Sequence, residues 1–187
     1  MMTMKKKTIT VITPCYNEQA NLKYFLKKFL KVKKKINKFN FNLVFVNDGS
    51  NDNTLKEIKS LFKKYKFIKY LSLTKNFGHQ NAIYAGLVNY SSDYYVVMDS
   101  DLQHDPSKIH EMVKNILKRK VDIIQMRKLN SNYESKFKIF ISKLFYFLFS
   151  SITKIKIDSG SSDFYMISKR VRDQIVISPF SKNFLRG

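Results

Sequence analysis

The sequence has one cysteine, little glycine and no long apolar run. Each of these shortages excludes a feature that some classes of protein have. Because Cys15 stands alone, no internal disulfide can form, which fits a reducing compartment. With only five glycines, the 187 residues contain no Gly/Ser linker, and we expect a single domain over residues 1–187. The apolar part of the N-terminus is about six residues long and runs into Pro14, too short for the roughly 7–15 residues of a signal peptide core.

Acidic residues are also scarce, at 14 against 35 lysines and arginines, so the formal net charge is +21. Such an excess predicts a polyanionic partner: nucleic acid, anionic lipid or a phosphorylated substrate. Lysine-rich tracts such as residues 33–35 also fit solvated helix faces, and compositional drift accounts for part of the charge. No nucleic-acid recognition module is visible, so we expect no nucleic-acid partner.

Strand-like and helix-like segments alternate over the first 126 residues. Short apolar runs predict strands at residues 8–13, 41–47, 67–73, 93–99 and 121–126. Apolar residues at helical spacing predict helices at residues 18–37, 54–65, 80–89 and 106–118. This alternation predicts an α/β fold with a mostly parallel sheet and helices on both faces.

Residues 136–157 differ, because aromatic and aliphatic side chains dominate there and Lys143 interrupts them. We expect an amphipathic helix near residues 136–152. The longest apolar run has fewer than about ten residues, whereas a bilayer span needs roughly 20. A core helix, a helix lying in the membrane interface and a true span all stay open, and the flanking basic residues suit the second.

Polar residues follow four predicted strands, in "TPCYNE", "NDGSNDNT", "TKNFGHQNAIYAG" and "DSDLQHD". Ligands of such sheets bind at the carboxyl ends of the strands. No G-x-G-x-x-G or P-loop motif occurs, so an ordinary dinucleotide site is not supported. Asp99 and Asp101 are candidate Mg²⁺ ligands, although a turn residue and a solvated carboxylate are the alternative. Asp48, at the end of the second strand, is well placed to bond a ribose or base.

Local capping patterns explain other polar residues. Asn17 is expected to cap the first helix, with Glu18 in its first turn, and Asp105 to cap the helix that starts at the following proline. His79 and His104 have no partner at metal-ligand spacing, so we expect no zinc site.

Four sequence motifs carry a family resemblance. In chain order they are "ITVITPCYNEQANL", "VFVNDGSNDNTL", "LTKNFGHQNAIYAGL" and "YYVVMDSDLQHDP". Together they resemble the GT-A glycosyltransferases of family 2, and within it the polyprenyl-phosphate sugar transferases, such as dolichol-phosphate mannosyltransferase and bactoprenol glucosyltransferases. The resemblance covers essentially the whole chain. It implies a Rossmann-like GT-A fold, with a nucleotide-sugar-binding part at residues 1–130 and an acceptor- and membrane-facing part at residues 131–187.

The resemblance also assigns roles on the donor side. It implies a nucleotide site made by Pro14, Tyr16, Glu18, Asp48, Asp99 and Gln103. Asp99 and Asp101 match the motif that holds Mg²⁺ or Mn²⁺. Asp101 and Asp163 match catalytic positions, and Asp163, in "SSDFYMISKRV", faces the sugar and acceptor.

On the acceptor side, the resemblance implies a phosphate site made by Arg127, Lys138, Ser142 and Arg186. Relatives carry an Arg where this chain has Lys138. Relatives usually continue past the "FLRG" segment, often into transmembrane helices, whereas this sequence stops at Gly187. We therefore expect either a fragment or natural truncation, or a protein whose membrane attachment falls to the helix at residues 136–157 and the basic surface.

The implied function is inverting, metal-dependent transfer of a hexose from a UDP- or GDP-linked sugar to undecaprenyl or dolichyl phosphate, in cell-wall or surface glycan biosynthesis. A phosphate acceptor, with a second pKa of about 6, needs a strong general base less than a hydroxyl does. Asp163 is accordingly expected to orient the acceptor. The resemblance implies a peripheral protein that works at the cytoplasmic side of an anionic membrane. Transfer to a glycan hydroxyl, and a truncated inactive membrane-associated homologue, are the alternatives.

Overall fold

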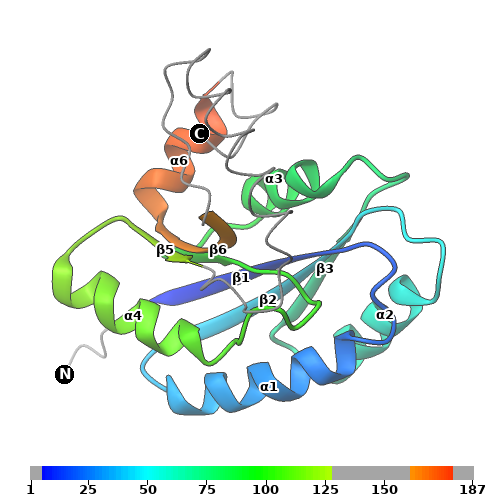
Figure 1. Cartoon of the computed structure of the whole chain (residues 1–187), viewed down its shortest axis with the longest axis horizontal. Coiled ribbons are helices and arrows are strands. Elements are labelled where there is room, and N and C mark those ends of the chain that lie inside the picture. Colours follow the sequence, from blue (N-terminus) through cyan, green and yellow to red (C-terminus); the bar gives the residue numbers. More distant parts are fainter. Residues whose placement is uncertain (1–5, 128–160, 179–187) are drawn as a thin grey trace, which may run out of the picture.

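The computed structural model describes residues 6–127 and 161–178, which form an α/β sandwich around a six-stranded sheet (Figure 1). The strands are β1 (Thr8–Cys15), β2 (Asn40–Asn47), β3 (Ile68–Ser72), β4 (Tyr94–Val97), β5 (Ile123–Arg127) and β6 (Ser161–Ser168). The helices are α1 (Leu22–Lys35), α2 (Thr54–Lys64), α3 (His79–Asn89), α4 (Lys108–Arg119) and α6 (Lys169–Ile177). The predicted fold class and the five predicted strands are confirmed.

The sheet has the strand order β3-β2-β1-β4-β6-β5. Strand β1 pairs in parallel with β2 and β4, and β2 pairs in parallel with β3. Strand β6 runs antiparallel to both of its neighbours, β4 and β5, so it is the one reversed strand among those described. The sequence pattern did not predict β6 or α6. Their effect is to bring residues 161–168 back beside the centre of the sheet.

Helices cover both faces of the sheet, as Figure 1 shows. Helices α1, α2 and α4 bury one hydrophobic layer, which includes Val11 of β1 and Phe25 of α1. Helices α3 and α6 cover the opposite layer, in which Ile12 packs with Ile83. Neighbouring residues of β1 thus face opposite layers, and because both layers are buried, the central strands are apolar along most of their length.

Helix α3 packs unusually close to β1 at Gly86. A Cβ atom at this position would lie 2.5 Å from Cγ2 of Ile12, so only glycine permits this approach. The close packing fixes the course of α3, whose first residue, His79, lies at the edge where the parallel strands end.

The first helix begins four residues later than predicted, at Leu22. Asn17 adopts a left-handed backbone conformation (φ 58°), and its Oδ1 accepts a hydrogen bond from the Asn51 backbone N–H at 2.9 Å. The predicted cap by Asn17 is therefore wrong, because the side chain bonds a neighbouring loop instead of the helix. Glu18 precedes the helix rather than lying in its first turn.

Helix α4 begins at Lys108, two residues after the predicted start at Pro106. The N-cap position is Ser107, which makes no side-chain cap bond, so the predicted cap by Asp105 is wrong. Asp105 Oδ1 instead accepts a hydrogen bond from the Ser107 backbone N–H at 3.0 Å, in the turn before the helix. This bond holds a tight turn in which the Lys108 N–H donates to the Asp105 carbonyl at 3.1 Å. Within residues 6–127 and 161–178, no helix is long and apolar enough to cross a bilayer, and the helix predicted near residues 136–152 lies outside these ranges.

Candidate active site

A cleft of about 330 Å³ opens where β1, β2 and β4 end and α3 begins. Predicted site residues that line it are Pro14, Tyr16, Glu18, Asp48, Asp99 and Asp101. The other lining residues are Cys15, Asn76, Gly78, His79 and Ser100. Parallel strands therefore bring together, at one edge, side chains that are far apart in the sequence. Gln103 is not part of the lining.

Asp48 is buried in the cleft wall, where it braces the loop between β3 and α3. Its Oδ1 accepts a hydrogen bond from the Phe77 backbone N–H at 2.8 Å, and its Oδ2 accepts one from the Gly78 N–H at 2.9 Å. A carboxylate oxygen has more than one lone pair, so both atoms retain acceptor capacity toward a ligand. The predicted contact of Asp48 with a nucleotide stays a prediction.

Gly49, the residue after Asp48, is required by the shape of this wall. Its φ is 63°, and a Cβ atom here would lie 2.3 Å from the carbonyl carbon of Lys75. The left-handed conformation is unfavourable for residues with a side chain, and the contact leaves no space for one. Glycine thus lets the end of β2 abut the loop that carries Phe77 and Gly78.

Two loops, residues 16–21 after β1 and residues 48–54 after β2, are joined by reciprocal hydrogen bonds; we call them the paired loops. Backbone N–H groups of the first loop donate to side chains of the second: Asn17 to Ser50 (3.0 Å), Glu18 to Thr54 (2.8 Å) and Gln19 to Asp52 (3.3 Å). Backbone N–H groups of the second donate to side chains of the first: Asn51 to Asn17 (2.9 Å) and Asn53 to Gln19 (3.2 Å). These bonds fix the backbone next to Tyr16 and Glu18 in the cleft.

Three carboxylates and a histidine lie together opposite these loops. Asp99 and Asp101 after β4 and His79 at the start of α3 line the cleft, whereas Asp163 on β6 does not line it but lies beside His79. We call these residues together the acidic cluster. His79 Nε2 lies 3.4 Å from Asp99 Oδ1 and 3.4 Å from Asp163 Oδ2. Antiparallel β6 thus places Asp163 beside Asp99. The sequence showed no partner for His79 at metal-ligand spacing, because one partner follows β4, the other lies on β6, and no local signal reveals them.

Asp99 is electrostatically strained in this cluster. In the part of the chain that the structure describes, its Oδ1 is buried and accepts no hydrogen bond. Burial raises the pKa of the Asp99 carboxyl, and the neighbouring charges of Asp101 and Asp163 raise it further, whereas His79 and His104 act in the opposite direction. A cation at this carboxylate would relieve the strain.

Asp101 turns into the cleft because the chain bends sharply after β4. Leu102 adopts a φ of 66°, and Asp101 Oδ1 accepts a hydrogen bond from the Gln103 backbone N–H at 3.0 Å. The alternation of the strand is broken, and both Asp99 and Asp101 face the same space. Their convergence agrees with the geometry predicted for a carboxylate pair.

The donor set of this pair fits a hard divalent cation. Carboxylate oxygens suit Mg²⁺ and Mn²⁺, which commonly use one or two protein carboxylates and complete their shell with phosphate oxygens and water. Among the described residues, no group of three or more His, Cys, Asp or Glu side chains is arranged to hold an ion. Asp99 and Asp101 would therefore share the ion with a bound ligand.

Cys15 lies on the floor of the cleft but is not suited to nucleophilic chemistry. Its thiol donates to the Thr13 carbonyl at 3.4 Å, and its Sγ lies 3.7 Å from Ser100 Oγ. Burial raises the pKa of the Cys15 thiol far above its usual range, so the reactive thiolate is not formed near neutral pH.

The predicted acceptor residues lie largely beyond the described structure. Arg127 is the last residue of β5 and is paired in register with Ser161 of β6. Lys138, Ser142 and Arg186 lie outside the described residues. The acceptor-phosphate site stays a prediction.

Solved structures identify this arrangement as the GT-A glycosyltransferase fold. The mannosyltransferase PcManGT from Pyrobaculum calidifontis, in complex with GDP-Man and Mn²⁺, superposes with a TM-score of 0.64 over 92% of this chain and 47% of that one, at 16% identity. Glucosyl-3-phosphoglycerate synthase from Mycobacterium tuberculosis, in complex with Mn²⁺, UDP and phosphoglyceric acid, gives 0.63 over 88% of this chain and 57% of that one, at 18% identity. At such identities the likeness establishes the fold.

The chain belongs to glycosyl transferase family 2, whose family model matches residues 10–176. An uncharacterized glycosyltransferase of Synechocystis sp. is 31% identical over 96% of this chain and 56% of its own length. A bactoprenol glucosyl transferase of Shigella phage SfV is 28% identical over 96% of this chain and 58% of its own length. The predicted family is confirmed, and the chain spans just over half the length of these relatives.

Proposed function

We propose that this chain is the donor-binding and catalytic domain of an inverting, metal-dependent transferase that moves a sugar from a nucleotide sugar to a polyprenyl phosphate. The observation that carries the proposal is the acidic cluster, in which Asp99 and Asp101 share a cleft and Asp163 faces them from β6. Similarity to bactoprenol glucosyl transferases supports the polyprenyl phosphate as acceptor.

On the donor side, the nucleotide would lie against the paired loops. Their reciprocal bonds hold Pro14, Tyr16 and Glu18 in a fixed frame, which lowers the cost of ordering the site around a ligand. Asp99 and Asp101 would hold Mg²⁺ or Mn²⁺, which when bound neutralises charge on the diphosphate leaving group. A UDP- or GDP-linked sugar is the expected donor.

On the acceptor side, a phosphate oxygen forms the new bond to the anomeric carbon while the bond from that carbon to the nucleoside diphosphate breaks. The opposite approach of the two groups inverts the anomeric carbon. The acceptor is already largely ionised near neutral pH, so no side chain has to remove a proton. Asp163 is proposed to orient this acceptor. Arg127, Lys138, Ser142 and Arg186 are proposed to bind its phosphate.

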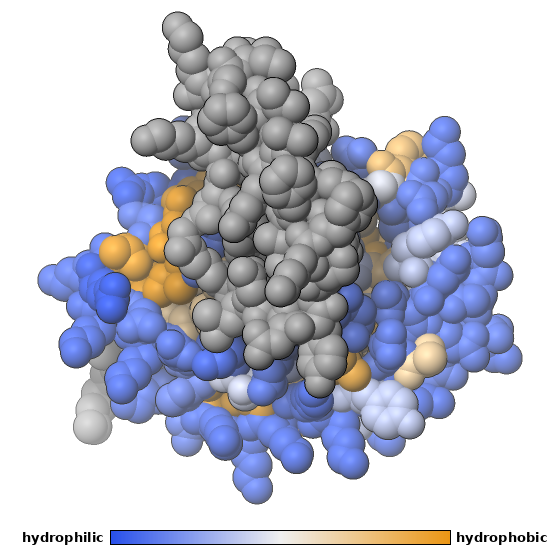
Figure 2. Space-filling model, in the orientation of Figure 1, coloured by the Kyte–Doolittle hydropathy of each residue, from blue (hydrophilic) through white to orange (hydrophobic). Residues whose placement is uncertain are grey.

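A polyprenyl acceptor requires the chain to work at a membrane. We propose peripheral attachment at the cytoplasmic face, supported by the net charge of +21. Hydrophilic residues cover most of the described face seen in Figure 2. Co-sedimentation should be strong with vesicles that contain anionic lipid, weak with neutral vesicles, and reduced by salt. Equal binding to both vesicle types would contradict the electrostatic attachment.

The transfer reaction is the direct test. Purified chain is mixed with Mn²⁺, undecaprenyl phosphate in detergent, and UDP-glucose or GDP-mannose, and lipid products are analysed by mass spectrometry and by NMR of the anomeric proton. The expected product is a sugar phospholipid with an inverted anomer, formed more slowly by Asp163→Asn. Transfer only to a glycan hydroxyl would contradict the proposed acceptor, and absence of both transfer and nucleotide binding would indicate an inactive homologue.

A further inference from the structure

His79 is the one member of the acidic cluster to which neither the resemblance nor the proposed function gives a task. We propose that His79 is a positioning residue, whose ring holds Asp163 next to Asp99 so that the acceptor-orienting acid faces the donor site. This inference rests on the proposed function. Its basis is the placement of one ring nitrogen at 3.4 Å from both carboxylates.

Two carboxylates brought this close repel each other, and partial burial strengthens the repulsion. When Nε2 carries the hydrogen, in the neutral ring or in the protonated one, its N–H lies between the two carboxylates and offsets part of that repulsion. Asp163 comes from the reversed strand β6, whereas Asp99 follows the parallel strand β4. Without the ring between them, we expect the Asp163 side chain to turn away from Asp99.

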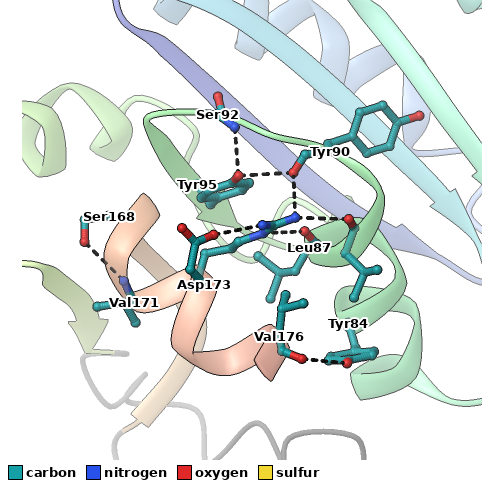
Figure 3. Close-up of polar contacts among 11 residues, drawn as sticks. Tyr84, Leu87, Tyr90, Ser92, Tyr95, Ser168, Val171, Asp173 and Val176 are labelled. Carbon is teal, nitrogen blue, oxygen red and sulfur yellow. Dashed lines mark hydrogen bonds and ion pairs between the residues drawn. The ribbon is translucent and has the colours of Figure 1, made fainter. Parts of the chain in front are cut away.

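The helix that carries His79 is anchored at its other end by the segment that follows Asp163. Arg172 of α6 bonds the last turn of α3. Figure 3 labels Leu87 and Tyr90, which lie where α6 meets this end of α3. The Arg172 guanidinium donates to the carbonyls of Leu87 (2.8 Å), Val88 (3.0 Å) and Tyr90 (3.4 Å). The β6–α6 segment thus contacts α3 at both ends: through Arg172 at the C-terminal end and through Asp163 and His79 at the cleft.

Two contacts fix the position of α3, and therefore the backbone position from which the His79 side chain reaches Asp163. Close packing at Gly86 sets the distance of α3 from β1, and the Arg172 bonds set its position relative to α6. A histidine on such a helix has little freedom other than rotation of its own side chain. The arrangement suits a residue that positions a partner rather than one that reacts.

Kinetics of the full chain separate positioning from donor binding. We compare wild type, His79→Ala and His79→Gln, with His110→Gln as a matched control, because His110 is exposed on α4. We expect His79→Ala to lower kcat at least about tenfold while the Kd of UDP or GDP with Mg²⁺ changes less than about threefold. Gln carries an N–H donor that can replace Nε2, so we expect His79→Gln to recover most of the rate.

Three outcomes would overturn the inference: an unchanged kcat in His79→Ala, a parallel loss of nucleotide affinity, or no recovery with Gln. If wild type transfers sugar but His79→Ala is normal, only this inference fails. If wild type neither binds UDP or GDP nor transfers sugar, the proposed function fails and the inference fails with it.

A second readout needs no turnover. The chain has three histidines, so the ring signals in ¹⁵N NMR spectra can be assigned with one variant each. We expect Asp163→Asn to shift the His79 ring signals more than those of His104 or His110. An unshifted His79 signal would show that the two side chains do not interact, and it would overturn the inference whatever the activity.

Discussion

The two sides of the cleft are built in opposite ways. In the paired loops, backbone N–H groups and side chains of one loop satisfy those of the other. In the acidic cluster, carboxylates crowd together, and a buried oxygen of Asp99 accepts no hydrogen bond within the described residues. Stable folding favours the first arrangement and opposes the second. A site retains such strain where a ligand relieves it, so the comparison separates a structural frame from a reactive centre.

The largest effect is expected from Asp99→Asn, which should lower the transfer rate without lowering the stability of the fold. Loss of the carboxylate should lower transfer about 100- to 1,000-fold, because charge stabilisation at the leaving group is lost. The free energy of unfolding should stay unchanged or rise, since a repulsion among Asp99, Asp101 and Asp163 is removed. Turnover and urea unfolding measure the two effects.

The control for this variant is Glu111→Gln, which neutralises an acid that pairs with Lys108 on the surface of α4. Neither property should change by much. If Asp99→Asn were destabilised but kept normal turnover, Asp99 would belong to the structural frame and not to the reactive centre.

In the structural frame, Gly49→Ala should be the most destabilising change. Left-handed backbone strain of about 1–2 kcal/mol adds to a clash with the Lys75 backbone, and we expect about 3 kcal/mol or more in urea unfolding. Gly78→Ala is the matched comparison, because Gly78 also has a positive φ but an added Cβ atom there would meet nothing within 4 Å, so we expect the smaller loss of about 2 kcal/mol from backbone strain alone. Equal losses would show that the abutting loops are not tightly packed.

A smaller loss is expected where α6 meets α3. Arg172→Met keeps an apolar stem but removes the donors to three carbonyls, which should cost about 2 kcal/mol. Arg170→Met removes a far more exposed guanidinium that pairs with Asp122, and it should cost clearly less because solvent screens that pair. Thermal unfolding of both variants checks the ranking, and a more damaging Arg170 variant would contradict it.

The smallest effect concerns the pH dependence of the paired loops. Burial raises the pKa of Asp52 slightly, but hydrogen bonds from Thr54 and Gln19 outweigh it, and the net pKa lies below the usual value of 3.8. A lowered folded-state pKa adds stability that is present above the unfolded-state pKa and is lost as pH falls through the folded value. Wild type should therefore be more stable than Asp52→Asn by a few tenths of a kcal/mol at pH 6, after solvent screening. The gap should close below about pH 3.8, and a gap that widens in acid would contradict the pKa direction.

The same comparison explains what the sequence could predict. Apolar runs located the parallel strands, and the rule that their carboxyl ends share one edge brought Tyr16, Asp48 and Asp99 to one cleft. The predicted start of α1 was wrong because the Asn17 side chain bonds Asn51, in a loop far along the chain, instead of capping the helix. Strand β6 and the place of His79 escaped prediction, since antiparallel pairing with β4 is a long-range choice that local pattern does not encode.

The central claim is that Asp99 and Asp101 form a metal-dependent nucleotide site. Calorimetric binding of UDP and GDP, with and without Mn²⁺, to wild type and Asp101→Ala tests it most directly. The account predicts that one nucleotide binds wild type only when the metal is present, and that Asp101→Ala abolishes this binding. Binding that is independent of Mn²⁺ and survives in Asp101→Ala, or no binding of either nucleotide, would contradict it.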